Sequence, residues 1–175
     1  MSRRKPEAIG PDSFEHISLD LQDRSASGEA LGRLSSVSHL VFAALSEKPG
    51  LVEDWRDTAQ MEINLRMFQN CVDPFLQQST LEHVTLMQAT KAYGPHLHPM
   101  EIPARESSAR DPHPNFYWLQ EDYLKDKSRE HGFRYTVFRP LDCRVGLRGR
   151  NEYGYRGDIQ ILGGELHFAE HHSWF

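Results

Sequence analysis

The stretch that decides the fold begins as Leu81-Glu-His-Val-Thr-Leu-Met87 and continues as Gln88-Ala-Thr-Lys-Ala-Tyr-Gly-Pro95. After a loop rich in proline and histidine it resumes as Pro114-Asn-Phe-Tyr-Trp-Leu-Gln-Glu-Asp122. The first segment has the apolar pattern of a buried strand, and the last opens a helix behind a favourable N-cap asparagine. The stretch therefore predicts one strand-to-helix unit of an α/β sheet.

Two polar residues in this stretch are candidates for chemistry. Lys91 lies just past the predicted strand, and Tyr117 lies in the first turn of the predicted helix. In parallel α/β sheets the strand-to-helix turns open on one edge, where ligands bind. A tyrosine and a lysine at that edge suggest proton donation to a substrate oxygen, or stabilisation of negative charge on it.

Strands and helices alternate on both sides of this stretch. Residues 37–45 form an apolar run without alternation, as expected of a parallel strand covered on both faces. Residues 55–73 carry two apolar stripes at helical spacing, and Pro74 should end or kink that helix. The helix before residue 37 is expected to be capped by Ser25 or Ser27. In chain order we predict strand 14–21, helix 25–36, strand 37–45, helix 55–73, strand 83–87, helix 115–131 and strand 133–139.

This order predicts the fold class and the domains. Alternating strands and helices with connections of this length give a parallel sheet with right-handed crossovers. We therefore expect an α/β fold, an incomplete Rossmann-type three-layer sandwich, over residues 1–146. Residues 147–175 read as an irregular tail rich in glycine, arginine and histidine, with a small hairpin around Gly163 and Gly164.

The composition is that of a globular, intracellular protein. Hydrophobic residues make up 38% and charged residues 26% of the 175 residues, which is enough apolar content for a folded core. A formal net charge of −5 argues against a nucleic-acid partner, and no apolar run approaches the length of a membrane span. Cys71 and Cys143 are too few for a disulfide framework, so we expect a reduced, cytoplasmic setting, with Cys71 in the core. No feature of the sequence fixes an oligomeric state.

From residue 2 to residue 146 the chain resembles the short-chain dehydrogenase/reductase superfamily, and within it the atypical branch of progesterone 5β-reductase and iridoid synthase. The segment 90–95 resembles that branch's T-G-x-K-H-Y-x-G-P, with Ala92 in place of the usual histidine. The segment 115–122 resembles its N-F-Y-Y-x-x-E-D, and 138–140 resembles the R-P that follows the next strand. The resemblance implies an enzyme that binds a nicotinamide cofactor.

The resemblance also implies roles for particular residues. Tyr117 would be the catalytic tyrosine and Lys91 the catalytic lysine, with NADPH as cofactor and a small molecule as substrate. The basic start of the chain would bind the adenosine 2′-phosphate, and Asn64 matches an asparagine of the family. The implied cofactor-binding residues are Arg3 and Arg4 at the phosphate, Asp20 and Leu21 beside the adenine, Ala43 and Ala44 in the turn after the next strand, and Leu141.

Two departures from the family qualify these expectations. The family begins with a strand and a Gly-rich turn that holds the pyrophosphate, whereas Met1 falls at the end of the family's second strand. After Gly146 a short unrelated tail replaces the family's substrate-binding region. We therefore expect a chain shortened at both ends that binds NADPH weakly or not at all. Two hypotheses stay open: an NADPH-dependent reductase of small carbonyl or enone substrates, and a non-catalytic remnant or interaction module.

Two other patterns have plainer interpretations. Tyr123 and Lys127 match the Tyr-x-x-x-Lys spacing of ordinary short-chain dehydrogenases, but Tyr123 lies nearly two turns into the helix. We interpret it as a packed aromatic beside a solvated lysine. The histidines include the pair His96 and His98, but no cysteine or carboxylate stands at zinc-ligand spacing around them, so we predict no metal site.

Overall fold

The computed structural model describes residues 1–3, 14–47, 57–78, 80–100 and 103–140, and the backbone of two further strands at 158–162 and 165–169. The chain forms two compact units, Met1–Arg139 and Pro140–Phe175. Within the described ranges, no helix is long and apolar enough to cross a membrane.

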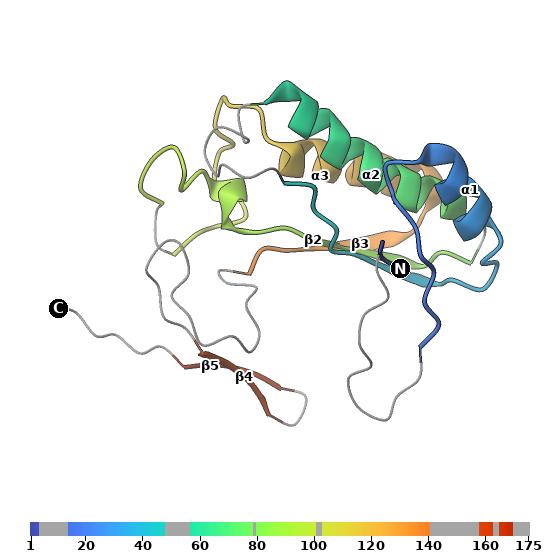
Figure 1. Cartoon of the computed structure of the whole chain (residues 1–175). Helices are drawn as coiled ribbons and strands as arrows, with labels where there is room; N and C mark the ends of the chain where they lie inside the picture. Colours follow the sequence, from blue (N-terminus) through green and yellow to red (C-terminus); the bar gives the residue numbers. More distant parts are fainter. Residues whose placement is uncertain are drawn as a thin grey trace. The chain divides into compact units, whose positions relative to one another are not determined.

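The first unit is a parallel sheet with helices packed on one face (Figure 1). Its elements are α1 (Arg24–Gly32), β1 (His39–Phe42), α2 (Thr58–Leu76), β2 (His83–Met87), the 3-10 helix η2 (Thr90–Tyr93), α3 (Phe116–His131) and β3 (Arg134–Phe138). The strand order is β1-β2-β3, and both neighbouring pairs are parallel. The predicted α/β fold of Rossmann type is therefore confirmed, and the described residues of this unit supply two layers of the expected sandwich.

The register of the sheet brings the three strand ends to one edge. His83 of β2 is paired with His39 of β1 and with Arg134 of β3. All three strands therefore start level and run in the same direction. The segments that follow them, including η2 and the start of α3, are gathered at the carboxyl edge of the sheet.

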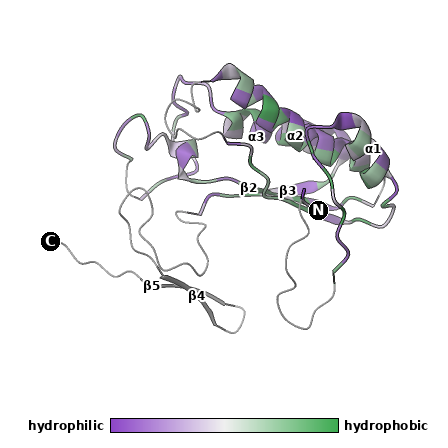
Figure 2. Ribbon diagram, in the orientation of Figure 1, coloured by the Kyte–Doolittle hydropathy of each residue, from purple (hydrophilic) through white to green (hydrophobic). Residues whose placement is uncertain are grey.

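The hydrophobic core lies between this sheet and the helices. Leu40 and Phe42 of β1 and Val84 and Leu86 of β2 are buried there. On the helical side they meet the buried residues Phe68, Val72, Phe75 and Leu124. Hydrophobic and hydrophilic residues alternate around the helices, as one-sided burial requires (Figure 2).

The opposite face of the sheet differs from the prediction. β1 is shorter than the predicted strand 37–45, and its burial alternates instead of being continuous. Val41 is 65% exposed and Phe138 is 51% exposed. Within the first unit, the described residues thus cover the sheet on one face only, and the expectation of cover on both faces is wrong for β1.

Residues 14–21 are a second correction, because they do not form a regular strand. A single parallel bridge joins Ser18 to Ser2, with Leu19 N–H donating to the Ser2 carbonyl at 3.2 Å. Ile17 and Leu19 nevertheless pack against the core. The alternation in the sequence therefore reports one-sided burial, which an extended segment shows with or without a complete hydrogen-bond ladder.

Three helix ends also differ from the prediction, and the first difference is that α1 ends at Gly32 and not at residue 36. α1 is capped by Asp23, whose Oδ1 accepts from the Ala26 N–H at 3.0 Å, and not by Ser25 or Ser27. α2 continues past Pro74 to Leu76. Pro74 lies two residues before the end of α2, so its missing N–H donor affects the last turn of the helix and not its middle.

The remaining elements are confirmed. β2 and β3 lie where the apolar runs predict them, and α3 runs from its N-cap Asn115 to Gly132, whose φ of 80° is the left-handed cap conformation. In the second unit, β4 (Asp158–Leu162) and β5 (Glu165–Ala169) pair antiparallel, as the predicted hairpin requires.

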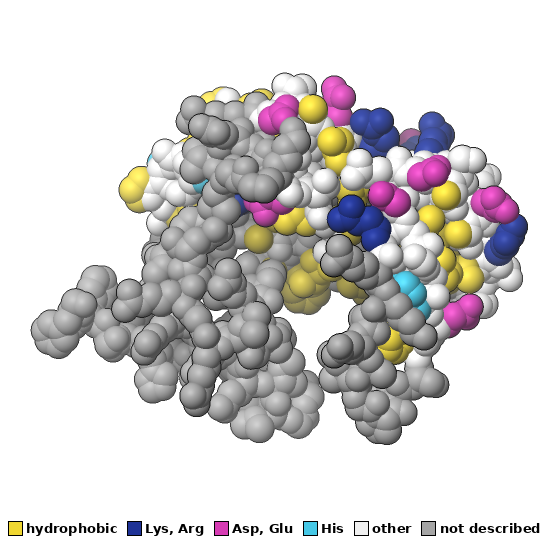
Figure 3. Space-filling view, in the orientation of Figure 1, with side chains coloured by type: hydrophobic (Ala, Val, Ile, Leu, Met, Phe, Trp, Pro, Cys, Tyr) yellow, Lys and Arg dark blue, Asp and Glu magenta, His cyan; other side chains and the backbone are white. Residues whose placement is uncertain are grey.

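The outer surface of the helical layer is charged. Acidic and basic side chains are interspersed over it (Figure 3), and some form ion pairs along a helix, such as Glu29 with Arg33 at 2.5 Å and Asp126 with Arg129 at 2.9 Å. Both pairs are well exposed to solvent. They mark the solvated side of the helices and contribute little to stability.

Candidate active site

The candidate site lies at the edge where the three strands end. Lys91 belongs to η2, which follows β2 after a short turn, and Tyr117 is in the first turn of α3. Lys91 is 8% exposed and Tyr117 is 7% exposed, so both residues are almost completely buried. The structure thus places the predicted pair at the same edge of the sheet, and their catalytic roles remain predictions.

Asn115 holds these two residues together. Its Oδ1 accepts from the Tyr117 N–H at 3.0 Å, which caps α3, and its Nδ2 donates to the Lys91 carbonyl at 3.0 Å. Asn115 is 5% exposed, and losing either bond would leave a buried polar group without a partner, which is costly. The small buried cluster around it contains Met61, Ala92, Phe116 and Tyr117.

The ammonium of Lys91 faces a carboxylate from the segment after β1. Lys91 Nζ lies 3.1 Å from Glu47 Oε1, and the two side chains are 10% and 31% exposed. This opposite charge compensates for the loss of water around the ammonium. Sequence reasoning missed Glu47, because nothing distinguishes it from an ordinary loop glutamate.

The segment after β1 also carries Ala43 and Ala44, two of the predicted cofactor contacts. Ala43 is exposed and Ala44 is half-buried. Asn64 of α2 fixes this segment through Ser46: its Oδ1 accepts from the Ser46 N–H at 2.9 Å, and its Nδ2 donates to the Ser46 carbonyl at 2.8 Å. The Asn64 side chain thus bonds to both backbone polar groups of Ser46, as a neighbouring strand would. These two bonds fix the path of the turn at the sheet edge.

The predicted adenine side of the cofactor site is partly described. The Arg3 carbonyl accepts from Ser18 Oγ at 3.2 Å, so Arg3 lies beside the segment that leads to Asp20 and Leu21. Arg3 and Asp20 are exposed, whereas Leu21 is buried in the core. Arg4 lies outside the described residues.

Leu21 is anchored through its backbone. Its carbonyl accepts from the buried Nδ2 of Asn70 at 2.7 Å, while Asp20 Oδ1 accepts from the Gln22 N–H at 3.0 Å. The turn after residues 14–19 is therefore fixed to α2, as the turn after β1 is. Leu141, the last predicted cofactor contact, lies outside the described residues.

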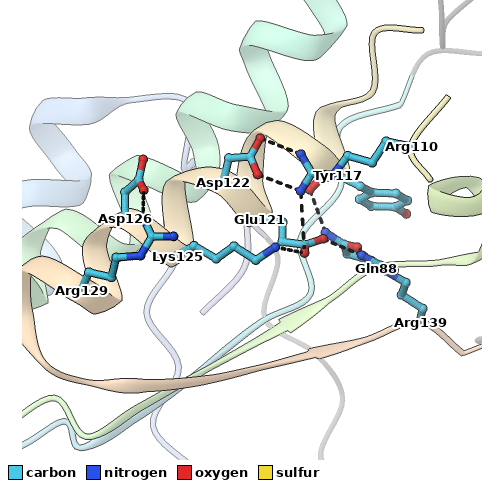
Figure 4. Close-up of polar contacts among 9 residues, drawn as sticks. All are labelled: Gln88, Arg110, Tyr117, Glu121, Asp122, Lys125, Asp126, Arg129 and Arg139. Atoms are coloured by element: carbon cyan, nitrogen blue, oxygen red, sulfur yellow. Dashed lines mark hydrogen bonds and ion pairs between the residues drawn. The ribbon is translucent and has the colours of Figure 1, made fainter. Parts of the chain in front are cut away.

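A buried polar network holds the start of α3 to the ends of β2 and β3 (Figure 4). Gln88 Nε2 donates to the Tyr117 carbonyl at 2.8 Å, and Gln88 Oε1 accepts from Arg139 Nε at 2.9 Å. Arg139 Nη2 donates to Glu121 Oε2 at 2.5 Å. Glu121 and Arg139, which both lie in segments that carry the family resemblance, therefore pair with each other. Nothing in the sequence indicated that Gln88 belongs to this network.

The loop before α3 is fastened to the same helix. Arg110 makes two hydrogen bonds of 2.7 Å to Asp122, and its guanidinium lies 4.5 Å from the centre of the Trp118 ring. Arg139 lies 4.8 Å from the same ring centre. The pairing with Arg110 lowers the pKa of the Asp122 carboxyl. Two arginines and one indole thus fix this loop against the helix start.

Tyr123 has the environment of a structural residue. Its hydroxyl donates to Asp73 Oδ1 of α2, and its ring packs edge-on against Phe68 at 5.9 Å. Burial and the hydrogen bond to Asp73 raise the pKa of the Tyr123 phenol. Lys127 pairs with Glu130 at 2.6 Å. The interpretation of Tyr123 as a packed aromatic is confirmed.

The histidines of the loop before α3 pack together. His96 and His113 lie with ring centres 5.1 Å apart, and His98 Nε2 is 2.8 Å from Asp111 Oδ1. Partial burial, with nearby His113 and Lys91, lowers the pKa of His96 from 6.5 to about 4. In the described ranges, no group of three or more histidine, cysteine or carboxylate residues could hold a metal ion.

Cys71 lies in the core, as predicted. It is 2% exposed on α2, and burial raises the pKa of its thiol to about 12. A thiol with this pKa is protonated at neutral pH and is a poor nucleophile. Cys71 therefore takes no part in the candidate site.

Comparison with known proteins finds relatives that include two named enzymes. A short-chain dehydrogenase of Penicillium aethiopicum is 31% identical over 132 residues, which are 73% of this chain and 33% of that protein. An (S)-8-oxocitronellyl enol synthase of Camptotheca acuminata is 27% identical over 146 residues, 79% of this chain and 36% of that protein. No family model matches the chain. The chain spans about a third of the length of the curated relatives that it matches.

Solved structures show the same fold. A UDP-glucose 4-epimerase from Brucella ovis in complex with NAD superimposes with a TM-score of 0.57 at 22% identity, over 72% of this chain and 38% of that one. At this identity the likeness concerns the fold alone. The first unit thus has the parallel α/β architecture of the Rossmann type.

Proposed function

This chain belongs to the short-chain dehydrogenases/reductases, and we propose that it carries the catalytic segment of an NADPH-dependent reductase. The substrate would be a small carbonyl compound or an enone. The observation that supports this most is the Asn115 amide, which hydrogen bonds to the Tyr117 N–H and to the Lys91 carbonyl. A buried tyrosine and a buried lysine are thereby fixed together where α/β sheets bind ligands.

In this proposal Tyr117 acts on the oxygen of the substrate. NADPH, when bound, supplies a hydride to the substrate carbon. The Tyr117 hydroxyl donates a hydrogen bond to the oxygen on which negative charge develops, as an alkoxide from a carbonyl or as an enolate from an enone. The Lys91 ammonium stabilises that charge electrostatically, and such preorganised donors are usually the largest contribution to catalysis.

The residues described near the adenine side fit a nicotinamide dinucleotide. Arg3 offers an exposed cation beside the Asp20 and Leu21 turn, and Ala44 offers a small side chain at the end of β1. A cation beside the adenosine is what a 2′-phosphate requires, which favours NADPH over NADH. Arg4 and Leu141 would complete the site.

The test is consumption of NADPH by two proteins. One is the 175-residue chain, and the other is a chimaera in which the flanking segments of the Penicillium relative are joined to its ends. Both are incubated with NADPH and a panel of small ketones, aldehydes and enones. Turnover that disappears in Tyr117→Phe and Lys91→Met supports the proposal. No turnover by either protein would favour the alternative, a non-catalytic interaction module.

Cofactor binding by the 175-residue chain gives a separate prediction. Its 175 residues contain no G-x-x-G-x-x-G segment, the motif whose backbone amides usually hold the pyrophosphate at the start of a helix. Each charge-assisted bond is worth about 1.5–3 kcal/mol, so losing two or three of them costs about two to six decades of affinity. We expect isothermal titration to show NADPH binding no tighter than millimolar. Micromolar binding would contradict this expectation and strengthen the case for an active chain.

A further inference from the structure

The buried amide of Gln88 connects the sheet to the backbone of Tyr117. Gln88 is 2% exposed, and its two ends have different partners: the Tyr117 carbonyl at 2.8 Å and Arg139 Nε at 2.9 Å. A carbonyl only accepts and an arginine only donates, so the orientation of the amide is fixed by its neighbours. Gln88 therefore cannot be turned around without losing both bonds.

Tyr117 is consequently held through both of its backbone polar groups. Its N–H donates to Asn115 Oδ1, and its carbonyl accepts from Gln88 Nε2. The side chain that carries the candidate hydroxyl leaves the backbone between these two bonds. Figure 4 shows Gln88 between Arg139 and the backbone at Tyr117. A shift of the first helical turn would have to break at least one of these contacts.

Arg139 and Glu121 secure α3 one helical turn after Tyr117. Their side chains are 10% and 11% exposed and lie 2.5 Å apart. Glu121 Oε1 also accepts from Lys125 Nζ at 2.6 Å. The Arg139 guanidinium lies 5.1 Å from the centre of the Tyr93 ring. A buried carboxylate with this many cationic neighbours has a defined position, and removing one partner leaves charge uncompensated.

We propose that Gln88 and Arg139 are positioning residues for the Tyr117 hydroxyl. They connect the ends of β2 and β3 to the first turn of α3, and so set where the hydroxyl stands relative to the sheet edge. This inference rests on the proposed function in that Tyr117 is the group that meets the substrate oxygen. Because a displacement of about 1 Å can cost about 100-fold in rate, such an anchor affects turnover without touching the substrate.

Three variants separate positioning from a general structural effect. Gln88→Glu keeps an acceptor for Arg139 but loses the N–H that the Tyr117 carbonyl accepts. Arg139→Lys keeps the charge but not the fork that reaches both Gln88 and Glu121. Asp73→Ala is the matched control, because it removes the hydrogen bond that holds α3 to α2 at Tyr123.

The experiment follows individual phenols in the 175-residue chain. The protein is labelled with ¹³C at the Cζ of its six tyrosines, and the signals are assigned with Tyr→Phe variants. We expect Gln88→Glu to move the Tyr117 signal and its titration midpoint while leaving those of Tyr123 in place. Asp73→Ala should do the reverse. If Gln88→Glu does not fold, Arg139→Lys should move the Tyr117 signal in the same way.

Kinetics in the chimaera give the second measurement. Gln88→Glu should lower kcat about 10- to 100-fold with the KM for NADPH within about twofold of the parent. An unmoved Tyr117 signal in both Gln88→Glu and Arg139→Lys would overturn the inference. So would a fall in kcat no larger than that of Asp73→Ala. Absence of turnover in the parent would reject the proposed function alone, since the Tyr117 signal would still decide whether Gln88 positions it.

Discussion

The two halves of α3 each carry a tyrosine, and they are held in different ways. At the first turn, the backbone of Tyr117 is fixed by the buried amides of Asn115 and Gln88, and Arg139 in turn holds Gln88. Two turns later, Tyr123 packs on Phe68, and its hydroxyl donates to Asp73 of the neighbouring helix. The first half is tied to the sheet edge, and the second half is tied to the helical layer.

This difference shows what spacing alone does not reveal. Tyr123 and Lys127 match a well-known catalytic spacing, yet the lysine pairs with Glu130 on the solvated side of α3. Tyr117 has no lysine at that offset, yet a buried lysine from another element shares its anchor. The surroundings of a residue, set by tertiary structure, distinguish a candidate catalytic tyrosine from a packing one.

The largest expected effect is a difference in turnover between variants of the two tyrosines. In the chimaera, Tyr117→Phe should lower kcat about 10²–10³-fold, because it removes one donor to the developing oxyanion and keeps the ring. NADPH affinity should hardly change, since that interaction grows only in the transition state. Tyr123→Phe should keep most of the activity. Inactivation by Tyr123→Phe with Tyr117→Phe still active would reverse the assignment.

A smaller effect, on the free energy of unfolding, is expected from a change in the second half of α3. Asp73→Ala removes the acceptor of the Tyr123 hydroxyl, and a hydrogen bond of this kind is worth roughly 1 kcal/mol net. The free energy of unfolding, measured by urea titration, should fall by about that amount. The backbone signals of residues 115–118 should stay unchanged. Large shifts there would mean that the two halves of the helix are coupled.

A pH effect is expected in the loop before α3. Between pH 6.5 and about 4, unfolded chains bind a proton at His96 that the folded protein excludes, because partial burial lowers its pKa to about 4. Stability should therefore fall as the pH decreases from about 6.5 to about 4. Solvent screening of this partly exposed ring reduces the effect. His96→Gln should flatten the curve of urea midpoint against pH, and an unchanged slope would count against the lowered pKa.

The smallest effect is expected at the exposed end of α3. Glu130 pairs with Lys127 at the surface, where the two side chains are 55% and 28% exposed, and such ion pairs contribute little. Glu130→Gln should leave the thermal midpoint within experimental error. A clear decrease of the thermal midpoint would show that the second half of α3 depends on its surface charges as well as on its buried contacts.

Much of the fold could be predicted from the sequence where the signals were local. β2, β3 and α3 have apolar runs with defined stops, and Asn115 and Gly132 mark the helix ends chemically. Residues 14–21 show the limit of such patterns. Alternation reports which side of a segment is buried, but a strand also needs a neighbour along its whole length, which depends on distant residues.

The candidate site was predictable only in part. The meeting of Lys91 and Tyr117 follows from topology, since strand-to-helix turns of a parallel sheet share an edge. Gln88 and Glu47 gave no local signal, because a glutamine after a strand and a glutamate in a loop are ordinary. Their importance arises from partners 29 and 44 positions away in the chain, which only folding brings near.

The double hydrogen bond of Asn115 has a consequence for how the loop before α3 can vary. Because one side chain joins the Lys91 carbonyl to the Tyr117 N–H, the distance between the two residues does not depend on the length of the chain between them. Doubling a flexible loop costs only about 0.6 kcal/mol in closure entropy. Segments of different length could therefore be grafted between residues 99 and 109 to reshape what approaches the sheet edge, with the chemical groups beneath left in place.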